Sequence, residues 1–251
     1  MSLRPASLPS PSIEYSVITP IKNEQENLPR LLDEIRSVMA DMGASWELIC
    51  VDDGSTDGSY ELLRQMQKNH PQLAVVKLDR NYGQSAALAA GWSQARGAWV
   101  ITLDADLQND PQDIRKLVAL KSEFDLINGW RVNRQDSLQK RWISKIANRI
   151  RSRLCADNVR DTGCSLKLMK REGLGQIFWF RGAHRFLPAL FKLYGYRVGE
   201  IPVHHRPRHK GQSNYHLFNR GLAPIMDMLA FIWLRRRHLN YKIESVHAPG
   251  P

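Results

Sequence analysis

Short runs of β-branched and aromatic residues alternate with longer runs of helical periodicity in the first half of the chain. The short runs predict five strands, at residues 15–19, 47–51, 74–78, 99–103 and 125–128. The longer runs predict three helices, at residues 28–42, from Asp57 to 68, and from Asp110 to about 121. Strands that alternate with helices are typical of a mostly parallel sheet flanked by helices. The predicted fold class is therefore α/β.

The first predicted helix shows the pattern most clearly. Asn27 is a candidate N-cap and Gly43 a candidate stop. Between them, one face of the helix carries the apolar residues Leu28, Leu31, Leu32, Ile35, Val38 and Met39. This face is expected to pack on the sheet.

Two later segments combine apolar and basic positions. Residues 137–155 place an apolar stripe among lysines and arginines, which predicts an amphipathic basic helix. Residues 217–234 form an apolar run that ends at three consecutive arginines, 235–237. The first segment can lie in a bilayer interface or pack on the sheet, because stripe width alone does not separate the two. The second is expected to be a membrane-facing surface segment or the end of a longer anchor.

Composition narrows the class of protein. The 251 residues are 43% hydrophobic, enough for a sizeable core, and 36 Lys+Arg against 25 Asp+Glu give a net charge of +11, which favours an anionic partner. Three cysteines without close spacing indicate neither a disulfide framework nor a zinc site. Residues 1–12 are expected to be a flexible tail rather than a secretory signal, and no spanning helix is predicted.

Acidic residues follow three of the predicted strands. Glu24 follows the first, Asp52 and Asp53 follow the second, and Asp104 and Asp106 follow the fourth. Such loops meet at one edge of a parallel sheet, where like charges are tolerated if a cation lies among them. The two acids of the last loop point to the same side if that segment is extended. They therefore predict a site for Mg²⁺ or Mn²⁺, although an isolated pair of this kind is also common in solvated turns and helix caps.

The order of these loops resembles the glycosyltransferase family 2 catalytic domain. Within that family, Asp104-Ala105-Asp106-Leu107-Gln108, Asp161-Thr162-Gly163-Cys164 and the segment 206–215 resemble the dolichyl- and polyprenyl-phosphate hexosyltransferase branch. The resemblance covers about residues 14–216. It implies a GT-A type catalytic domain at 13–216, followed by a membrane-proximal amphipathic segment and tail at 217–251.

The resemblance also implies roles for individual residues. Asp104 and Asp106 match catalytic positions, and Asp161 is a candidate base because Cys164 stands where some relatives have an acid. The implied donor-binding residues are Pro20, Glu24, Asp52, Asp53, Asp104 and Ala105. The implied ligands of Mg²⁺ or Mn²⁺ are Asp104, Asp106 and Gln108. The implied acceptor or phosphate contacts are Arg131, Arg206, Arg208 and Ser213.

The expected function is the inverting transfer of a hexosyl group from a GDP- or UDP-sugar to dolichyl or undecaprenyl phosphate. The expected location is the cytoplasmic face of a membrane, held peripherally. A family 2 enzyme with a saccharide or other non-lipid acceptor is the alternative. A nucleic-acid-binding protein is only a remote alternative, because the sequence has no motif that recognises nucleic acid and this function would not explain the acidic loops. No nucleic acid is therefore expected as a partner. The sugar, the base, a homo-oligomer and a membrane partner subunit are left open.

Overall fold

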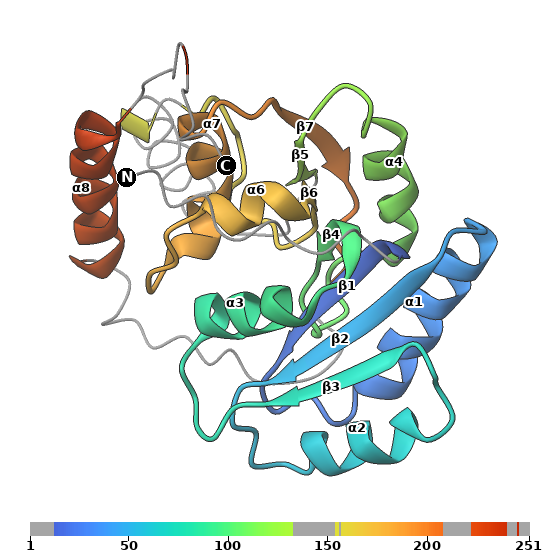
Figure 1. Ribbon diagram of the computed structural model, residues 1–251. Coiled ribbons are helices and arrows are strands. Elements are labelled where there is room, and N and C mark those ends of the chain that lie inside the picture. Colours follow the sequence, from blue (N-terminus) through green and yellow to red (C-terminus); the bar gives the residue numbers. More distant parts are fainter. Residues whose placement is uncertain (1–12, 133–153, 156, 208–221, 240–244, 246–251) are drawn as a thin grey trace, which may run out of the picture.

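A seven-stranded mixed sheet forms the centre of the computed structural model, which describes residues 13–132, 154–155, 157–207, 222–239 and 245 (Figure 1). The strands are β1 (Ile13–Ile21), β2 (Trp46–Asp52), β3 (Leu73–Lys77), β4 (Gly97–Thr102), β5 (Leu126–Arg131), β6 (Lys167–Lys170) and β7 (Val198–Val203). Their order across the sheet is β3-β2-β1-β4-β6-β5-β7. All neighbours are parallel except β6, which runs antiparallel to β4 and β5.

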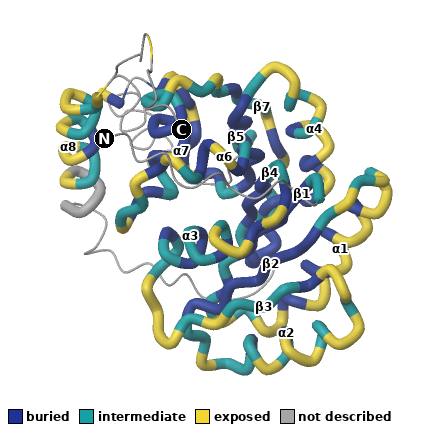
Figure 2. Tube along the Cα trace, in the orientation of Figure 1, coloured by how far each residue is buried: buried dark blue, intermediate teal, exposed yellow. Residues whose placement is uncertain are grey.

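Helices cover both faces of this sheet (Figure 1). They are α1 (Leu28–Asp41), α2 (Ser59–Gln67), α3 (Gln84–Gln94), α4 (Ile114–Ala119), α6 (Arg171–Gln176), α7 (Leu187–Leu193) and α8 (Leu222–Arg237), with short 3-10 helices η1 (Pro111–Asp113) and η2 (Ala183–Arg185). Alternation along β1 sends Val17 into the core shared with α1 and α4, and Ile18 into the core shared with α3 and α7. The sheet is thus buried between two hydrophobic cores (Figure 2).

The predicted fold class and the five predicted strands are confirmed. The six apolar residues assigned to one face of the first helix are all buried in α1, which gives way to Gly43 at a left-handed φ of 65°. Asn27 occupies the N-cap position, but its side chain makes no cap hydrogen bond and instead donates to Glu24. The helix predicted from Asp110 is shorter than expected, because it is divided between η1 and α4.

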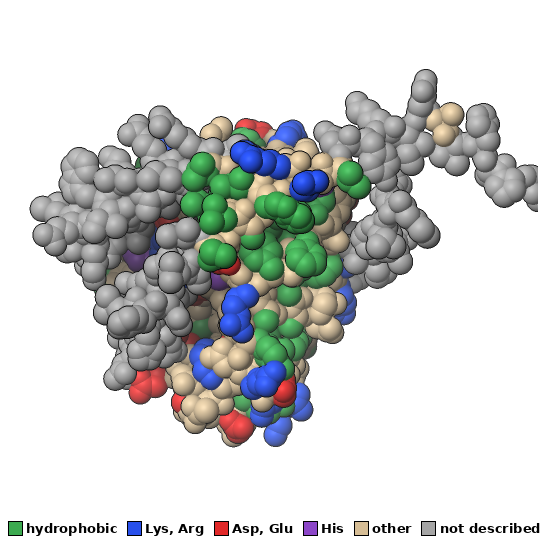
Figure 3. Space-filling model, turned by 90° about the vertical axis from the view of Figure 1, so that its left-hand side faces the viewer, with side chains coloured by type: hydrophobic (Ala, Val, Ile, Leu, Met, Phe, Trp, Pro, Cys, Tyr) green, Lys and Arg blue, Asp and Glu red, His purple; other side chains and the backbone are tan. Residues whose placement is uncertain are grey.

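The predicted basic helix at 137–155 lies outside the described residues, apart from its last two positions. The other predicted amphipathic segment does contain a helix, α8. Phe231 of α8 is buried and stacks on Phe186, with 5.5 Å between ring centroids. On the same helix, Met226, Leu229 and Trp233 are more than half exposed, at 62%, 52% and 64%. Figure 3 looks onto this side and shows hydrophobic side chains gathered there beside Lys and Arg.

Among the described residues, no helix has the length and apolar character needed to cross a bilayer.

Candidate functional site

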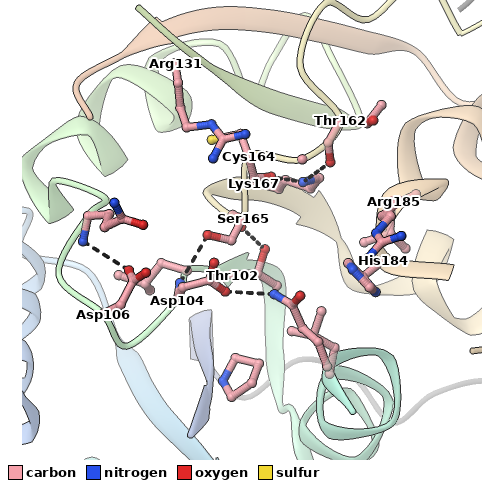
Figure 4. A pocket seen from close by; sticks show the side chains of 17 residues that line it. Thr102, Asp104, Asp106, Arg131, Thr162, Cys164, Ser165, Lys167, His184 and Arg185 are labelled. Atoms are coloured by element: carbon pink, nitrogen blue, oxygen red, sulfur yellow. Dashed lines mark hydrogen bonds between the residues drawn. The ribbon is translucent and has the colours of Figure 1, made fainter. Parts of the chain in front are cut away.

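The acidic loops meet where β2, β1 and β4 end. These strands are adjacent and parallel, and Ile21 of β1 pairs with Asp52 of β2. Beside this edge lies a cavity of about 270 Å³ (Figure 4). Five of the residues predicted from sequence line it, namely Pro20, Asp104, Asp106, Gln108 and Arg131.

Asp104 and Asp106 reach the cavity from a turn, and not from the extended segment that the sequence argument assumed. Leu107 takes a left-handed φ of 61°, and the side chain of Ala105 packs in the core. Asp104 Oδ1 accepts a hydrogen bond of 2.8 Å from Gln84 Nε2, and Asp106 Oδ1 accepts one of 3.1 Å from the backbone N–H of Gln108. The turn thus directs both carboxylates into the same cavity (Figure 4).

The carboxylate pair is electrostatically costly without a cation. Burial, and secondly the charge of Asp106, raise the pKa of Asp104 from 3.8 to about 6. In the described part of the chain, no cluster of three or more His, Cys, Asp or Glu forms a complete metal cage. Two carboxylates beside the amide side chain of Gln108 fit a hard cation such as Mg²⁺ or Mn²⁺ that completes its coordination with phosphate and water oxygens.

A basic wall faces these carboxylates. Arg131 forms a two-pronged ion pair with Asp161, with Nε–Oδ2 at 2.7 Å and Nη2–Oδ1 at 2.9 Å. Burial alone would lower the pKa of Arg131, but the hydrogen bonds and charge of Asp161 raise it above its usual value. Lys167, which is buried, donates from Nζ to the backbone oxygens of Thr162 and Cys164. The cavity therefore has the carboxylates of Asp104 and Asp106 on one side and the basic side chains of Arg131 and Lys167 on another.

The predicted donor-binding acids at the end of β2, Asp52 and Asp53, do not line the cavity. Both oxygens of Asp53 accept backbone hydrogen bonds, from Tyr82 at 2.7 Å and Gly83 at 2.8 Å. The next residue, Gln84, binds Asp104. The loop at 82–84 therefore links Asp53, which follows β2, to Asp104, which follows β4. Asp52, which is fully buried, accepts from the backbone N–H of Ser55.

Three other predicted residues make contacts outside the lining of the cavity. Glu24 accepts from Asn27, and Arg206 pairs with Glu34 at 2.6 Å and with Asp110 at 2.8 Å. Neither Glu24, Arg206 nor Asp161 is among the lining residues of the cavity. Their proposed roles stay predictions, and Arg208 and Ser213 lie outside the described residues.

Comparison with known proteins agrees with this geometry. Residues 16–178 match the family described as glycosyl transferase family 2. The chain belongs to glycosyltransferase family 2. It is also 40% identical, over 243 residues, to the undecaprenyl-phosphate 4-deoxy-4-formamido-L-arabinose transferases of Salmonella paratyphi B and Salmonella newport. That match spans 96% of this chain and 74% of each relative.

Solved structures share the fold of this glycosyltransferase. Glucosyl-3-phosphoglycerate synthase from Mycobacterium tuberculosis, in complex with Mn²⁺, UDP and phosphoglyceric acid, aligns with a TM-score of 0.66 at 18% identity, covering 91% of this chain and 80% of the other. A mannosyltransferase from Pyrobaculum calidifontis, in complex with GDP-mannose and Mn²⁺, aligns with a TM-score of 0.62 at 21% identity, covering 90% and 72%. The predicted GT-A type architecture is confirmed.

The site of the glycosyltransferase also contains residues that sequence reasoning did not assign to it. Lys167 and Ser165 reach the cavity from β6 and the residues just before it, and His184 and Arg185 reach it from η2. The available signal for Lys167 was a buried lysine position at the start of the short strand Lys167–Lys170.

Proposed function

We propose that this family 2 glycosyltransferase transfers a sugar from a UDP- or GDP-sugar to a polyprenyl phosphate, with Mg²⁺ or Mn²⁺ as cofactor. The observation that carries the proposal is the pair Asp104 and Asp106 facing Arg131, Lys167 and Arg185 across one cavity. The carboxylates suit a metal-bound diphosphate, whereas the cations suit a second anionic group. A lipid phosphate is such a group.

Asp104, Asp106 and Gln108 would hold the cation, which, when bound, offsets the charge that develops on the leaving diphosphate. Arg131 is held rigidly by both oxygens of Asp161, so its guanidinium is preorganised to bind the acceptor phosphate. Because a phosphate is already an anion at neutral pH, it can attack the anomeric carbon without first losing a proton. Direct displacement by this anion inverts the anomeric centre, and Asp161 then serves to orient Arg131.

A lipid acceptor is favoured for two reasons. Relatives that are 40% identical over nearly the whole chain are named as undecaprenyl-phosphate transferases. In addition, α8 packs through Phe231 on Phe186, directly after the cavity residue Arg185, and exposes Leu229 and Trp233 on its outer side. An apolar helix surface next to basic residues suits contact with a bilayer. We propose that this contact places the enzyme at the cytoplasmic face, where the lipid phosphate is reached.

The proposal is tested with purified protein, Mn²⁺, undecaprenyl phosphate in vesicles and a panel of sugar nucleotides. The panel is UDP-4-deoxy-4-formamido-L-arabinose, UDP-glucose, UDP-N-acetylglucosamine and GDP-mannose. We expect one donor to yield a lipid-linked sugar of inverted anomeric configuration, and EDTA or Asp104→Asn to abolish its formation. Transfer to a soluble acceptor such as 3-phosphoglycerate, with none to the lipid, would contradict the lipid assignment.

A further inference from the structure

Three residues that line the cavity have no role in the proposed chemistry of metal and phosphate. They are Leu88 of α3, His184 of η2 and Leu187 at the start of α7, and they belong to one wall of the cavity. Figure 4 shows His184 on the opposite side of the cavity from Asp106. The same elements also contribute Gln84 and Arg185, so this wall combines apolar, uncharged polar and basic side chains. Its two leucines and its imidazole suit the transferred sugar better than a diphosphate.

Hydrogen bonds to Ser85 fix which nitrogen of His184 carries the proton. The Ser85 hydroxyl is buried and accepts from two backbone N–H groups, those of Gly182 at 3.1 Å and His184 at 3.3 Å. Because a hydroxyl oxygen has two lone pairs, its own hydrogen is left to donate, and the His184 Nδ1 lies 2.7 Å away. Nδ1 is therefore the acceptor, and the proton of the neutral ring lies on Nε2.

The ring is also kept uncharged. Burial, and then the charges of Arg185 and Lys167, lower the pKa of His184 to about 3. In the described part of the chain, no protein group bonds to Nε2. His184 thus presents to the cavity one N–H donor, of fixed tautomer and without charge.

We propose that the Nε2–H of His184 recognises an uncharged acceptor oxygen, a hydroxyl or an amide carbonyl, on the sugar that is transferred. The inference rests on the proposed function and deepens it by assigning a residue that determines donor specificity. A sugar that presents an ammonium group at this position is rejected, because the imidazole offers it a donor instead of an acceptor and because Arg185 and Lys167 repel it. A sugar that presents nothing there leaves the donor unsatisfied.

Two substitutions separate the recognition of ligand from the packing of the wall. In His184→Asn, the amide can still accept from Ser85, but no donor remains at the position of Nε2. In His184→Gln, the longer amide can place a donor near that position. His70→Asn is the matched control, because His70 lies before β3 at the opposite edge of the sheet from the cavity. Circular dichroism and thermal unfolding without ligand verify that each variant folds.

The affinities of the sugar nucleotide and of its parent nucleoside diphosphate are measured by calorimetry with Mn²⁺, using the donor panel given above. We expect His184→Asn to weaken binding of the accepted sugar nucleotide about tenfold and to leave the nucleoside diphosphate unchanged. His184→Gln should recover part of the loss, and His70→Asn should show none. In turnover, the donor KM of His184→Asn should rise more than the lipid KM.

Three results would overturn the inference. Equal weakening of sugar nucleotide and nucleoside diphosphate would place the contact on phosphate. A change confined to the lipid KM would place it on the acceptor. Unchanged affinity of His184→Asn for the accepted sugar nucleotide would remove His184 from recognition. If the wild-type protein binds no sugar nucleotide of the panel, the proposed function itself fails, and this result is distinct from all three.

Discussion

Asp104 is placed where it costs stability, so neutralising it should stabilise the metal-free protein. Burial and Asp106 raise its pKa from 3.8 to about 6. At neutral pH the folded protein therefore carries an unfavourable charge that costs about 1–3 kcal/mol relative to the unfolded chain. The cost is present above pH 6 and disappears as pH falls towards 3.8, because the folded state then binds the proton more tightly. Asparagine has the same shape and can still accept from Gln84.

Urea unfolding in EDTA at neutral pH measures this cost in wild type and in Asp104→Asn. The variant should gain about 1–3 kcal/mol in free energy of unfolding, and about 2–4 °C in Tm for each kcal/mol. Saturating Mn²⁺ should stabilise wild type and have little effect on the variant, because a bound ligand stabilises only the state that holds it. As the pH is lowered from 7 to about 5, protonation of Asp104 should also raise the unfolding free energy of the wild type in EDTA. A variant that is less stable than wild type in EDTA would refute the reasoning.

Three further predictions follow from the same geometry. Because the pKa of Asp104 is raised, Mn²⁺ affinity should be full above about pH 7 and fall as pH drops through about 6, which calorimetry across that range measures. Arg131→Met removes the guanidinium that neutralises buried Asp161 and should cost about 3–5 kcal/mol in urea unfolding, most of which the double variant with Asp161→Leu should recover. Leu229→Ser with Trp233→Ser should weaken flotation with vesicles severalfold at nearly unchanged unfolding free energy, since both side chains are more than half exposed.

Periodicity was enough to predict the elements whose neighbours are close in the sequence. The five predicted strands and the buried face of α1 agree with the structure, because alternation and helical spacing are local properties. β6 and β7 were missed. β6 has only four residues with lysine at each end, and it inserts between β4 and β5 through antiparallel pairing that no local pattern encodes. α3 was missed because its alanine-rich sequence has no apolar stripe.

The acidic half of the site could be predicted because its members follow strands that end at one edge. The basic and apolar residues on the other sides of the cavity could not be predicted in this way. Arg185 and His184 come from η2, far from the acids in sequence, and η2 packs against α3 beside the cavity. The partner of Asp53 was equally hidden, because its carboxylate binds the loop at 82–84, which then holds Asp104 through Gln84.

The central claim is that Asp104 and Asp106 hold a divalent ion together with a nucleoside diphosphate. Calorimetric titration of UDP and GDP into the protein, with Mn²⁺ or with EDTA, tests it most directly. A cation and a diphosphate that contact each other in one site strengthen each other's binding, and by the same factor. We expect one nucleotide to bind at least tenfold more tightly with Mn²⁺, and this gain to vanish in Asp104→Asn and in Asp106→Asn. Equal affinity with Mn²⁺ and with EDTA, or an undiminished gain in both variants, would contradict the account.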